Sequence, residues 1–160
     1  MLSIRPATVE DVPLLRTLIR ELAEFERLSE FAVLTEQDLV RDGFGATPRF
    51  RAVIAEWDGQ AAGYACFFPV YSTFEARAGL FLEDLFVRSQ FRGKGIGKAL
   101  LAHLARLALE ERCQGVHWEV LDWNQSAIDF YQSLGAEFRD AWRNVKLSGE
   151  ALRRLAEKAK

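Results

Sequence analysis

The feature that most constrains this chain is an apolar segment that runs directly into a glycine-rich turn and then into a leucine-rich segment. Residues Leu80 to Val87 are apolar except for Glu83 and Asp84. Three glycines and a series of leucines at helical spacing follow: Gly93, Gly95, Gly97, Leu100, Leu101, Leu104 and Leu107. This order predicts a strand, a tight turn and a helix that runs to Arg112. A strand expected from Val116 to Leu121 would complete a right-handed, parallel βαβ unit.

The N-terminal half predicts two helices and an antiparallel pair of strands. Apolar residues recur at helical spacing from Thr8 to about Arg27, and a second, short helix begins at Thr35 and ends in the DGFG stretch. Strands are expected from Phe50 to Trp57 and from Ala61 to Phe68, because Asp58-Gly59 between them is a typical two-residue hairpin turn.

The C-terminal part predicts a helix, a strand and a helical tail. Asn124 is the expected N-cap of a helix that continues through Leu134 and ends at Gly135. A last strand is expected near Arg143 to Leu147, followed by a helix from Glu150 to Lys158. No linker or internal repeat interrupts residues 1–160, so we expect a single domain of mixed α/β (α+β) class.

Composition excludes several classes of protein. The chain has 160 residues with 21 Lys plus Arg against 23 Asp plus Glu, which gives a net charge of -2 and argues against a nucleic-acid partner. It has no apolar run of membrane-spanning length and no secretory signal at its start, so we expect a cytoplasmic protein without membrane contact. Cys66 and Cys113 lack zinc-ligand spacing, and we expect two reduced thiols and no metal.

The glycine-rich turn stands where backbone N–H groups and a helix N-terminus can hold a phosphate. Two nucleotide-binding motifs fit it poorly. A Walker loop needs a hydroxyl residue after its lysine, but Ala99 follows Lys98. The dinucleotide fingerprint needs a third glycine where Lys98 stands.

The pattern Arg92-x-x-Gly95-x-Gly97 resembles the coenzyme A pyrophosphate loop of the GNAT N-acetyltransferase superfamily. Further segments fall in the family's order over nearly the whole chain: RPAT at Arg5–Thr8, LTEQDL and DGFG within Leu34–Gly45, LEDLFV at Leu82–Val87, and WN with FY within Trp123–Tyr131. They are most similar to the branch of diamine (spermidine/spermine) and thialysine acetyltransferases. The resemblance implies the acyl-CoA N-acyltransferase fold, with a mixed sheet of about six or seven strands flanked by helices and splayed into a V at the acetyl-CoA site.

The resemblance also implies an acetyl-CoA-dependent N-acetyltransferase of the EC 2.3.1 class, and the chemistry requires a base. A primary amine with a pKa near that of Lys, about 10.4, is protonated at neutral pH and cannot attack a thioester. Glu83 matches the family's acidic position and is the candidate, directly or through water. Among apolar neighbours an acid is costly unless it is paired or functional, so an ion pair with a basic neighbour is the alternative. Asp84 alternates to the opposite face and is expected to be structural.

Tyr131 matches the family tyrosine that gives a proton to the leaving thiolate; the alternative is core packing. The resemblance implies that pantetheine runs along Leu85, Phe86 and Val87, and that Gly93, Gly95, Ile96 and Gly97 wrap the pyrophosphate beside Arg92, Lys94 and Lys98. It implies further coenzyme contacts at Asn124, Gln125, Ser126, Ala127 and Tyr131, although Asn124 could equally be a plain N-cap.

For the acceptor, the resemblance implies contacts from Phe25 and Glu26 and from His117, Trp118 and Glu119, in addition to Glu83. The alternatives are a solvated surface carboxylate for Glu26 and a packed strand histidine for His117. Alternation along a strand lets one or two of the last three face the site. The loop from Tyr71 to Gly79 is expected to be long enough to cover a groove. Its Tyr71-Ser72-Thr73-Phe74 lacks the acid of polyamine-selective members, which favours a thialysine-like or lysine-like amine over spermidine, with Glu75 as a possible substitute for that acid.

Two alternatives stay open: a protein or peptide acceptor on the same fold, and a non-catalytic acetyl-CoA-binding module. The second predicts loss of the proton-handling groups, whereas Glu83 and Tyr131 are both present. A homodimer is expected from the family, with Phe138 to Trp142 as a candidate contact. The sequence does not identify the amine, nor which subunit completes each acceptor site.

Overall fold

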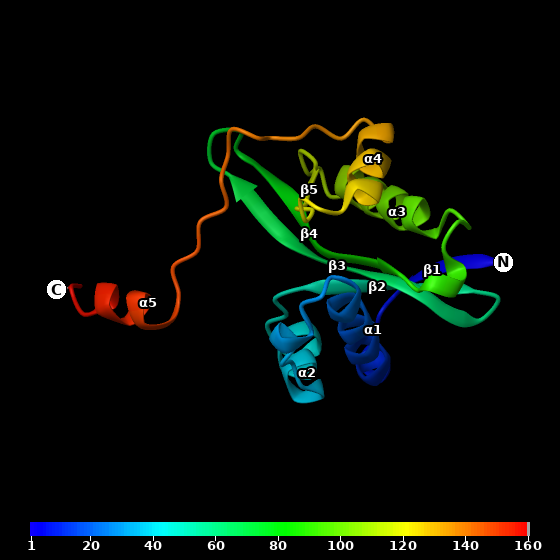
Figure 1. Cartoon of the computed structure of the whole chain (residues 1–160), viewed down its shortest axis with the longest axis horizontal. Coiled ribbons are helices and arrows are strands. Elements are labelled where there is room, and N and C mark those ends of the chain that lie inside the picture. The colour runs from blue at the N-terminus through cyan, green and yellow to red at the C-terminus, as the bar shows by residue number, and fades with distance from the viewer. Residues whose placement is uncertain (160) are drawn as a thin grey trace. The chain divides into compact units, whose positions relative to one another are not determined.

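The computed structural model describes residues 1–159, which form two compact units: the first is Met1–Glu119, and the second holds the described residues from Val120 onward. The first unit is built on a five-stranded sheet of order β1-β2-β3-β4-β5 (Figure 1). The strands are β1 Leu2–Pro6, β2 Arg51–Trp57, β3 Gln60–Ser72, β4 Arg77–Val87 and β5 Val116–His117. Neighbours are antiparallel from β1 to β4, and β4 and β5 are parallel. The mixed sheet and the parallel βαβ unit confirm the expected fold class.

Helices cover both faces of this sheet. On one face lie α1 (Val12–Phe25) and α2 (Glu36–Phe44), and on the other lies α3 (Ile96–Glu110) (Figure 1). The face under α1 and α2 holds a cluster of buried side chains from α1, α2, β2, β3 and β4, among them Leu18, Ile54, Tyr64, Cys66 and Phe86. The helical spacing of apolar residues therefore places the helices as predicted, each with its apolar stripe against the sheet.

The register of β3 and β4 shifts once, at Glu83. Cys66 is paired with Asp84 and the next residue, Phe67, is paired with Leu82, so Glu83 has no partner on β3. An extra residue of this kind is a β-bulge, and it reverses the alternation of side chains along its strand. Asp84 consequently shares the α1 face with Cys66, while Leu82 shares the opposite face with Phe67.

The second unit contains α4 (Gln125–Ser133) and α5 (Gly149–Ala156). Asn124 caps α4, because its side chain accepts a hydrogen bond from the N–H of Ala127 at 3.3 Å. Gly135 follows α4 with a φ of +83°, a left-handed conformation that favours glycine. Both boundaries agree with the prediction.

Four sequence-based expectations about the strands and their connections are wrong. The sheet has five strands instead of six or seven. The strand expected from Val116 to Leu121 ends at His117, because its partner β4 bends at the bulge directly after the paired Leu80 and Phe81. Within the described residues, 143–147 form no strand and leave Val145 88% exposed. The loop expected from Tyr71 to Gly79 is only a short turn at residues 73–76, because β3 continues to Ser72 and β4 begins at Arg77. The sequence analysis did not predict β1, because its five residues are too few to show a clear alternation of apolar and polar side chains.

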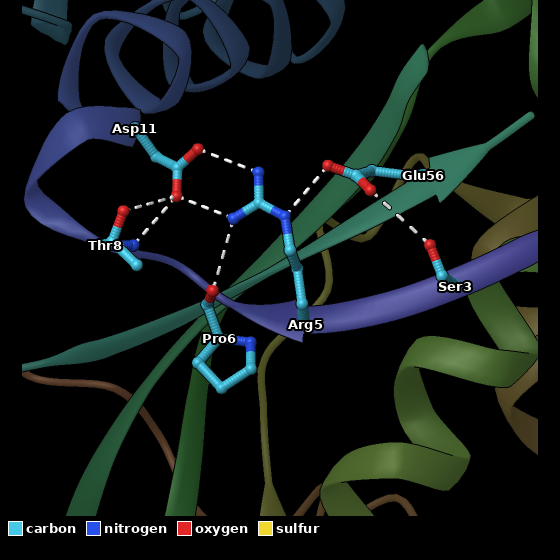
Figure 2. Close-up of polar contacts among 6 residues, drawn as sticks. All are labelled: Ser3, Arg5, Pro6, Thr8, Asp11 and Glu56. Carbon is cyan, nitrogen blue, oxygen red and sulfur yellow. Dashed lines mark hydrogen bonds and ion pairs between the residues drawn. The ribbon is translucent and has the colours of Figure 1, made fainter. Parts of the chain in front are cut away.

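A network around Arg5 fixes the start of α1 to the sheet (Figure 2). The Arg5 guanidinium donates two hydrogen bonds to Asp11, at 2.7 and 2.9 Å, and one to Glu56 on β2 at 2.9 Å. Asp11 also accepts from the backbone N–H of Thr8 at 2.8 Å, which closes a capping box before α1. The hydrogen bonds from Arg5 are the main reason why the pKa of Asp11 is lowered from 3.8 to about 2.

We predict that Asp11→Asn lowers the free energy of unfolding at pH 7 by about 1 kcal/mol, a value reduced for solvent screening. Because the folded-state pKa is depressed, the contribution of Asp11 is present above about pH 4 and is lost as the pH falls toward 2. The stability difference between the variant and the wild type should therefore shrink over this window in urea unfolding. Asp42→Asn, which breaks an exposed pair with Arg41, is the control and should change stability much less. A difference that stays constant from pH 7 to pH 3 would contradict the assignment.

Candidate active site

The second half of β4 leaves one backbone edge open. Pairing between β4 and β5 is limited to Leu80 with Val116 and Phe81 with His117. Within the described residues no strand pairs with 85–87 on that edge. Residues Leu85 to Val87, which the sequence analysis assigned to the pantetheine arm, thus offer backbone groups to an extended ligand.

The turn after β4 holds two glycines in conformations that favour glycine. Gly93 has a φ of +76° and Gly95 a φ of +77°, and Gly95 is the N-cap of α3. No side chain caps this helix, so the N–H groups of Ile96, Gly97 and Lys98 are not used within its first turn. A Cβ placed on Gly93 or Gly95 would have no atom within 4 Å. The turn therefore presents free backbone donors beside open space, as an anion-binding turn requires.

The basic side chains of this turn are held against aromatic rings. The Arg92 guanidinium lies 4.4 Å from the centre of the Phe25 ring, at the end of α1, and its Nε donates to the carbonyl of Val87 at 3.0 Å. The Lys94 ammonium lies 4.9 Å from the centre of the Trp57 ring. The contact between Arg92 and Phe25 brings together two residues that the sequence analysis assigned to different ligands, coenzyme and acceptor.

The structure corrects the expected environments of the two acids in β4. Glu83 is exposed at the bulge rather than enclosed by apolar neighbours, so the cost of burial does not apply to it. Asp84 is the half-buried carboxylate, and it accepts a hydrogen bond from the hydroxyl of Tyr64 at 3.0 Å. Burial is the main cause that raises the pKa of Asp84 to about 6; the charges of Glu83 and Glu26 add to it, and the Tyr64 hydrogen bond opposes it.

Glu26 follows α1 as its C-cap, and burial raises its pKa as well. Within residues 1–159, Glu26, Glu83 and Asp84 form no ion pair. Glu21, one turn earlier on α1, is in contrast paired with Arg88 at 2.7 Å. The charges of Glu83 and Glu26 act on Asp84, and the three unpaired acids give this region a negative charge that a cation would offset.

His117 and its neighbours lie at and beyond β5. The His117 ring lies against Gly79, where a Cβ would come within 3.3 Å of Nε2. This Nε2 is buried and, among the described residues, has no hydrogen-bond partner. Trp118 is half-buried and Glu119 is exposed.

The remaining predicted residues belong to the second unit. Asn124 serves as the N-cap of α4, the structural alternative for this residue, and Gln125 donates to Asp129 at 2.7 Å. Ser126 is exposed and Ala127 half-buried at the same helix start. Tyr131 is 8% exposed, with its ring centre 5.5 Å from that of Phe130.

The described residues, 1–159, contain neither a metal-ion cluster nor a membrane-spanning helix. No group of three or more His, Cys, Asp or Glu side chains is placed to hold a metal ion, and no helix is long and apolar enough to cross a membrane. A hollow of about 560 Å³ lies between the start of α1 and α2, lined by Val9, Glu10, Val12, Pro13, Glu36, Gln37, Val40 and Arg41. None of these is a predicted site residue.

Comparison with known proteins identifies the class to which this fold and site belong. The profile of the acetyltransferase (GNAT) family matches residues 14–136. The chain is 37% identical to thialysine N-epsilon-acetyltransferase of Sus scrofa over 97% of both chains, and 33% identical to L-ornithine N5-acetyltransferase of Arabidopsis thaliana over 95% of this chain and 86% of that protein. The structure of an integron cassette protein from V. cholerae is 27% identical, covers 98% of both chains and superposes with a TM-score of 0.83.

The chain therefore belongs to the acetyltransferase (GNAT) family, whose members use acetyl-CoA, and it is an acetyltransferase of the EC 2.3.1 class. This confirms the resemblance that the sequence motifs indicated.

Sequence reasoning missed the special environment of Asp84 and its partner Tyr64. Regular alternation predicts that Leu82 and Asp84 share a face, and the bulge separates them. The signal available in the sequence was two consecutive acids inside an otherwise apolar strand, because regular alternation places one of them on each covered face.

We predict that Gly95→Ala weakens acetyl-CoA binding at least about fivefold. The new Cβ would occupy the open space beside the free N–H groups, and alanine disfavours a φ of +77°. Gly59→Ala is the matched control, because Gly59 has a φ of +78° and equally open surroundings but lies in the β2–β3 turn. Both variants should lose about 1 kcal/mol of stability in urea unfolding. Calorimetric titration should show weaker binding for Gly95→Ala alone; equal affinities would contradict the assignment of this turn.

Proposed function

We propose that this protein transfers the acetyl group of acetyl-CoA to a primary amine of a small amine or amino acid that is thialysine-like, lysine-like or a di- or polyamine. Transfer occurs by direct attack in a ternary complex. The observation that carries the proposal is the contact between Arg92 and Phe25. It joins the phosphate-binding turn to the end of α1, where the unpaired Glu26 lies next in sequence. An anion site and a cation site are thus neighbours, as a reaction between a coenzyme thioester and an ammonium compound requires.

In the proposed complex the coenzyme follows the open edge of β4. Pantetheine bonds to the backbone of Leu85, Phe86 and Val87. The pyrophosphate lies on the N–H groups of Gly93, Lys94, Gly95, Ile96, Gly97 and Lys98, with Arg92 adding positive charge. Asn124, Gln125, Ser126 and Ala127 contribute further contacts. The free donors at the start of α3 support this arrangement.

The acceptor amine must lose a proton before it attacks. Glu83 takes this proton, directly or through water, and the exposure of Glu83 supports a route through water. The amine nitrogen then bonds to the thioester carbon, and the carbon–sulfur bond breaks as the intermediate collapses. Tyr131 gives a proton or a hydrogen bond to the leaving thiolate.

The acceptor is held as a cation. Glu26 faces its ammonium, with further contacts from Phe25, His117, Trp118 and Glu119. The raised pKa values of Glu26 and Asp84 support a cation site, because burial raises both values, the charges of Glu83 and Glu26 add to the effect at Asp84, and neither acid has a compensating charge. The relatives named for thialysine and ornithine support a small amino acid as acceptor.

We also propose that the protein is a cytoplasmic homodimer. Exposed apolar side chains in residues 138–155 support a contact with a second copy: Phe138, Trp142, Val145, Leu147, Leu152 and Leu155. Light scattering coupled to gel filtration should give twice the chain mass of 18.2 kDa. A single-chain mass at micromolar concentration would contradict the dimer.

The proposed activity is tested by release of coenzyme A thiol from acetyl-CoA with thialysine, lysine, ornithine, putrescine, spermidine and a generic peptide. We expect turnover with thialysine or another small amine, and a loss of at least about tenfold in kcat for Tyr131→Phe, which lacks the donor for the leaving thiolate. Turnover with the peptide alone would indicate a protein acceptor. Binding of acetyl-CoA without thiol release from any acceptor would indicate a non-catalytic module.

A further inference from the structure

Tyr64 lies in the middle of β3 and is fully buried, with 0% of its surface exposed. Its ring packs edge-on to Phe86, with ring centres 6.5 Å apart. Its hydroxyl donates to Oδ2 of Asp84 at 3.0 Å. A buried hydroxyl needs a hydrogen-bond partner, and the partner of the Tyr64 hydroxyl is a carboxylate on the neighbouring strand.

The other groups around Asp84 leave the carboxylate without a compensating charge. Cys66 is opposite to it on β3, Glu83 precedes it on β4, and Glu26 acts on it from the end of α1. Within residues 1–159, none of the groups that act on Asp84 is a cation. Oδ1 of Asp84 has no hydrogen-bond partner within the described residues, and the residue is only half-buried. Asp84 therefore has one oxygen fixed by Tyr64 and one oxygen available.

We propose that Tyr64 is a positioning residue of the acceptor site. Its hydroxyl fixes Asp84 and favours the ionised carboxyl, so that Oδ1 faces the ammonium group of the acceptor. This inference rests on the proposed function, because it needs a cationic acceptor. A purely structural hydrogen bond would not require the charge of Asp84, since an asparagine would satisfy the Tyr64 hydroxyl equally well.

Loss of the Tyr64 hydroxyl should change the activity in a pH-dependent way. The hydrogen bond from Tyr64 lowers the pKa of Asp84, against burial and the charges of Glu83 and Glu26, which raise it. Tyr64→Phe keeps the ring and removes this donor, so the pKa of Asp84 should rise by about one unit. Activity that needs the ionised form should then fall about fivefold at pH 6 relative to the wild type, and less than twofold at pH 8.5.

The first measurement uses the free protein and needs no turnover. Carbon-13 NMR of the aspartate side-chain carboxyls, with the Asp84 signal assigned by its absence in Asp84→Asn, should give a midpoint near pH 6 in the wild type. The midpoint should move up in Tyr64→Phe and stay in place in Tyr71→Phe, which removes a hydroxyl from the same strand at an exposed position. Adding a saturating acceptor amine to the wild type should lower the midpoint, because a nearby cation favours the carboxylate.

The second measurement is the pH dependence of kcat/KM for the acceptor amine. We expect the acid limb of Tyr64→Phe at higher pH than that of the wild type, and no further shift when Tyr64→Phe is added to Asp84→Asn. A loss of activity of the same size at every pH would overturn the proposal, since loss of packing alone predicts that result. An Asp84 midpoint that Tyr64→Phe leaves in place would also overturn it.

The two measurements separate this inference from the proposed function. If the Asp84 midpoint responds to Tyr64→Phe but not to any amine, and no acceptor is turned over, then the proposed function fails and the role of Tyr64 in it fails as well. If an acceptor is turned over while the Asp84 midpoint ignores both Tyr64→Phe and the amine, the proposed function stands and the role of Tyr64 is wrong. Even if Tyr64→Phe folds poorly, the amine-dependent shift of the Asp84 midpoint in the wild type tests whether Asp84 faces the acceptor.

Discussion

The backbone pairing of β3 with β4 decides which side chains line each face of the first unit, and it shifts once, at Glu83. The shift leaves Glu83 exposed and turns Asp84 toward the face under α1 and α2. A bulge also bends its strand, and the pairing of β4 with β5 ends at Phe81, just before it. One unpaired residue thus produces two carboxylates in different environments and the open backbone edge at Leu85–Val87.

Helix α1 is held along its length by cations from β1, from the end of β4 and from the turn that follows β4. Arg5 pairs with Asp11 just before the helix, Arg88 at the end of β4 pairs with Glu21, and Arg92 stacks on Phe25 in its last turn. The pair between Arg88 and Glu21 is partly buried, and Arg88 also donates to a β3 carbonyl, so it is fixed more firmly than a surface ion pair. These contacts fix the end of α1, and Glu26 with it, relative to the turn that starts α3.

The sequence predicted the helices well, because helical spacing and caps such as Thr35 and Asn124 depend on neighbouring residues alone. Strand ends were predicted less well, because a strand requires a partner: Val116–Leu121 loses its partner after His117, and residues 143–147 pair with no strand in the described chain. The motif correctly placed the glycine-rich turn between a strand and a helix, and both acids within β4. It could not assign their faces, because a continuous apolar run gives no sign of a bulge.

The different environments of the acids address a conflict in the proposed reaction. An acceptor is bound best as a cation, yet it attacks only as a neutral amine. Half-buried carboxylates such as Glu26 and Asp84 gain most from a bound ammonium, because the cation offsets the desolvation that raises both pKa values and, at Asp84, the repulsion from Glu83 and Glu26. An exposed carboxylate such as Glu83 exchanges protons with water readily. An acceptor with two amino groups satisfies both requirements, with one nitrogen held as a cation and the other deprotonated for attack. For the proposed reaction we therefore expect a diamine or a lysine-like amino acid to be a better acceptor than a monoamine.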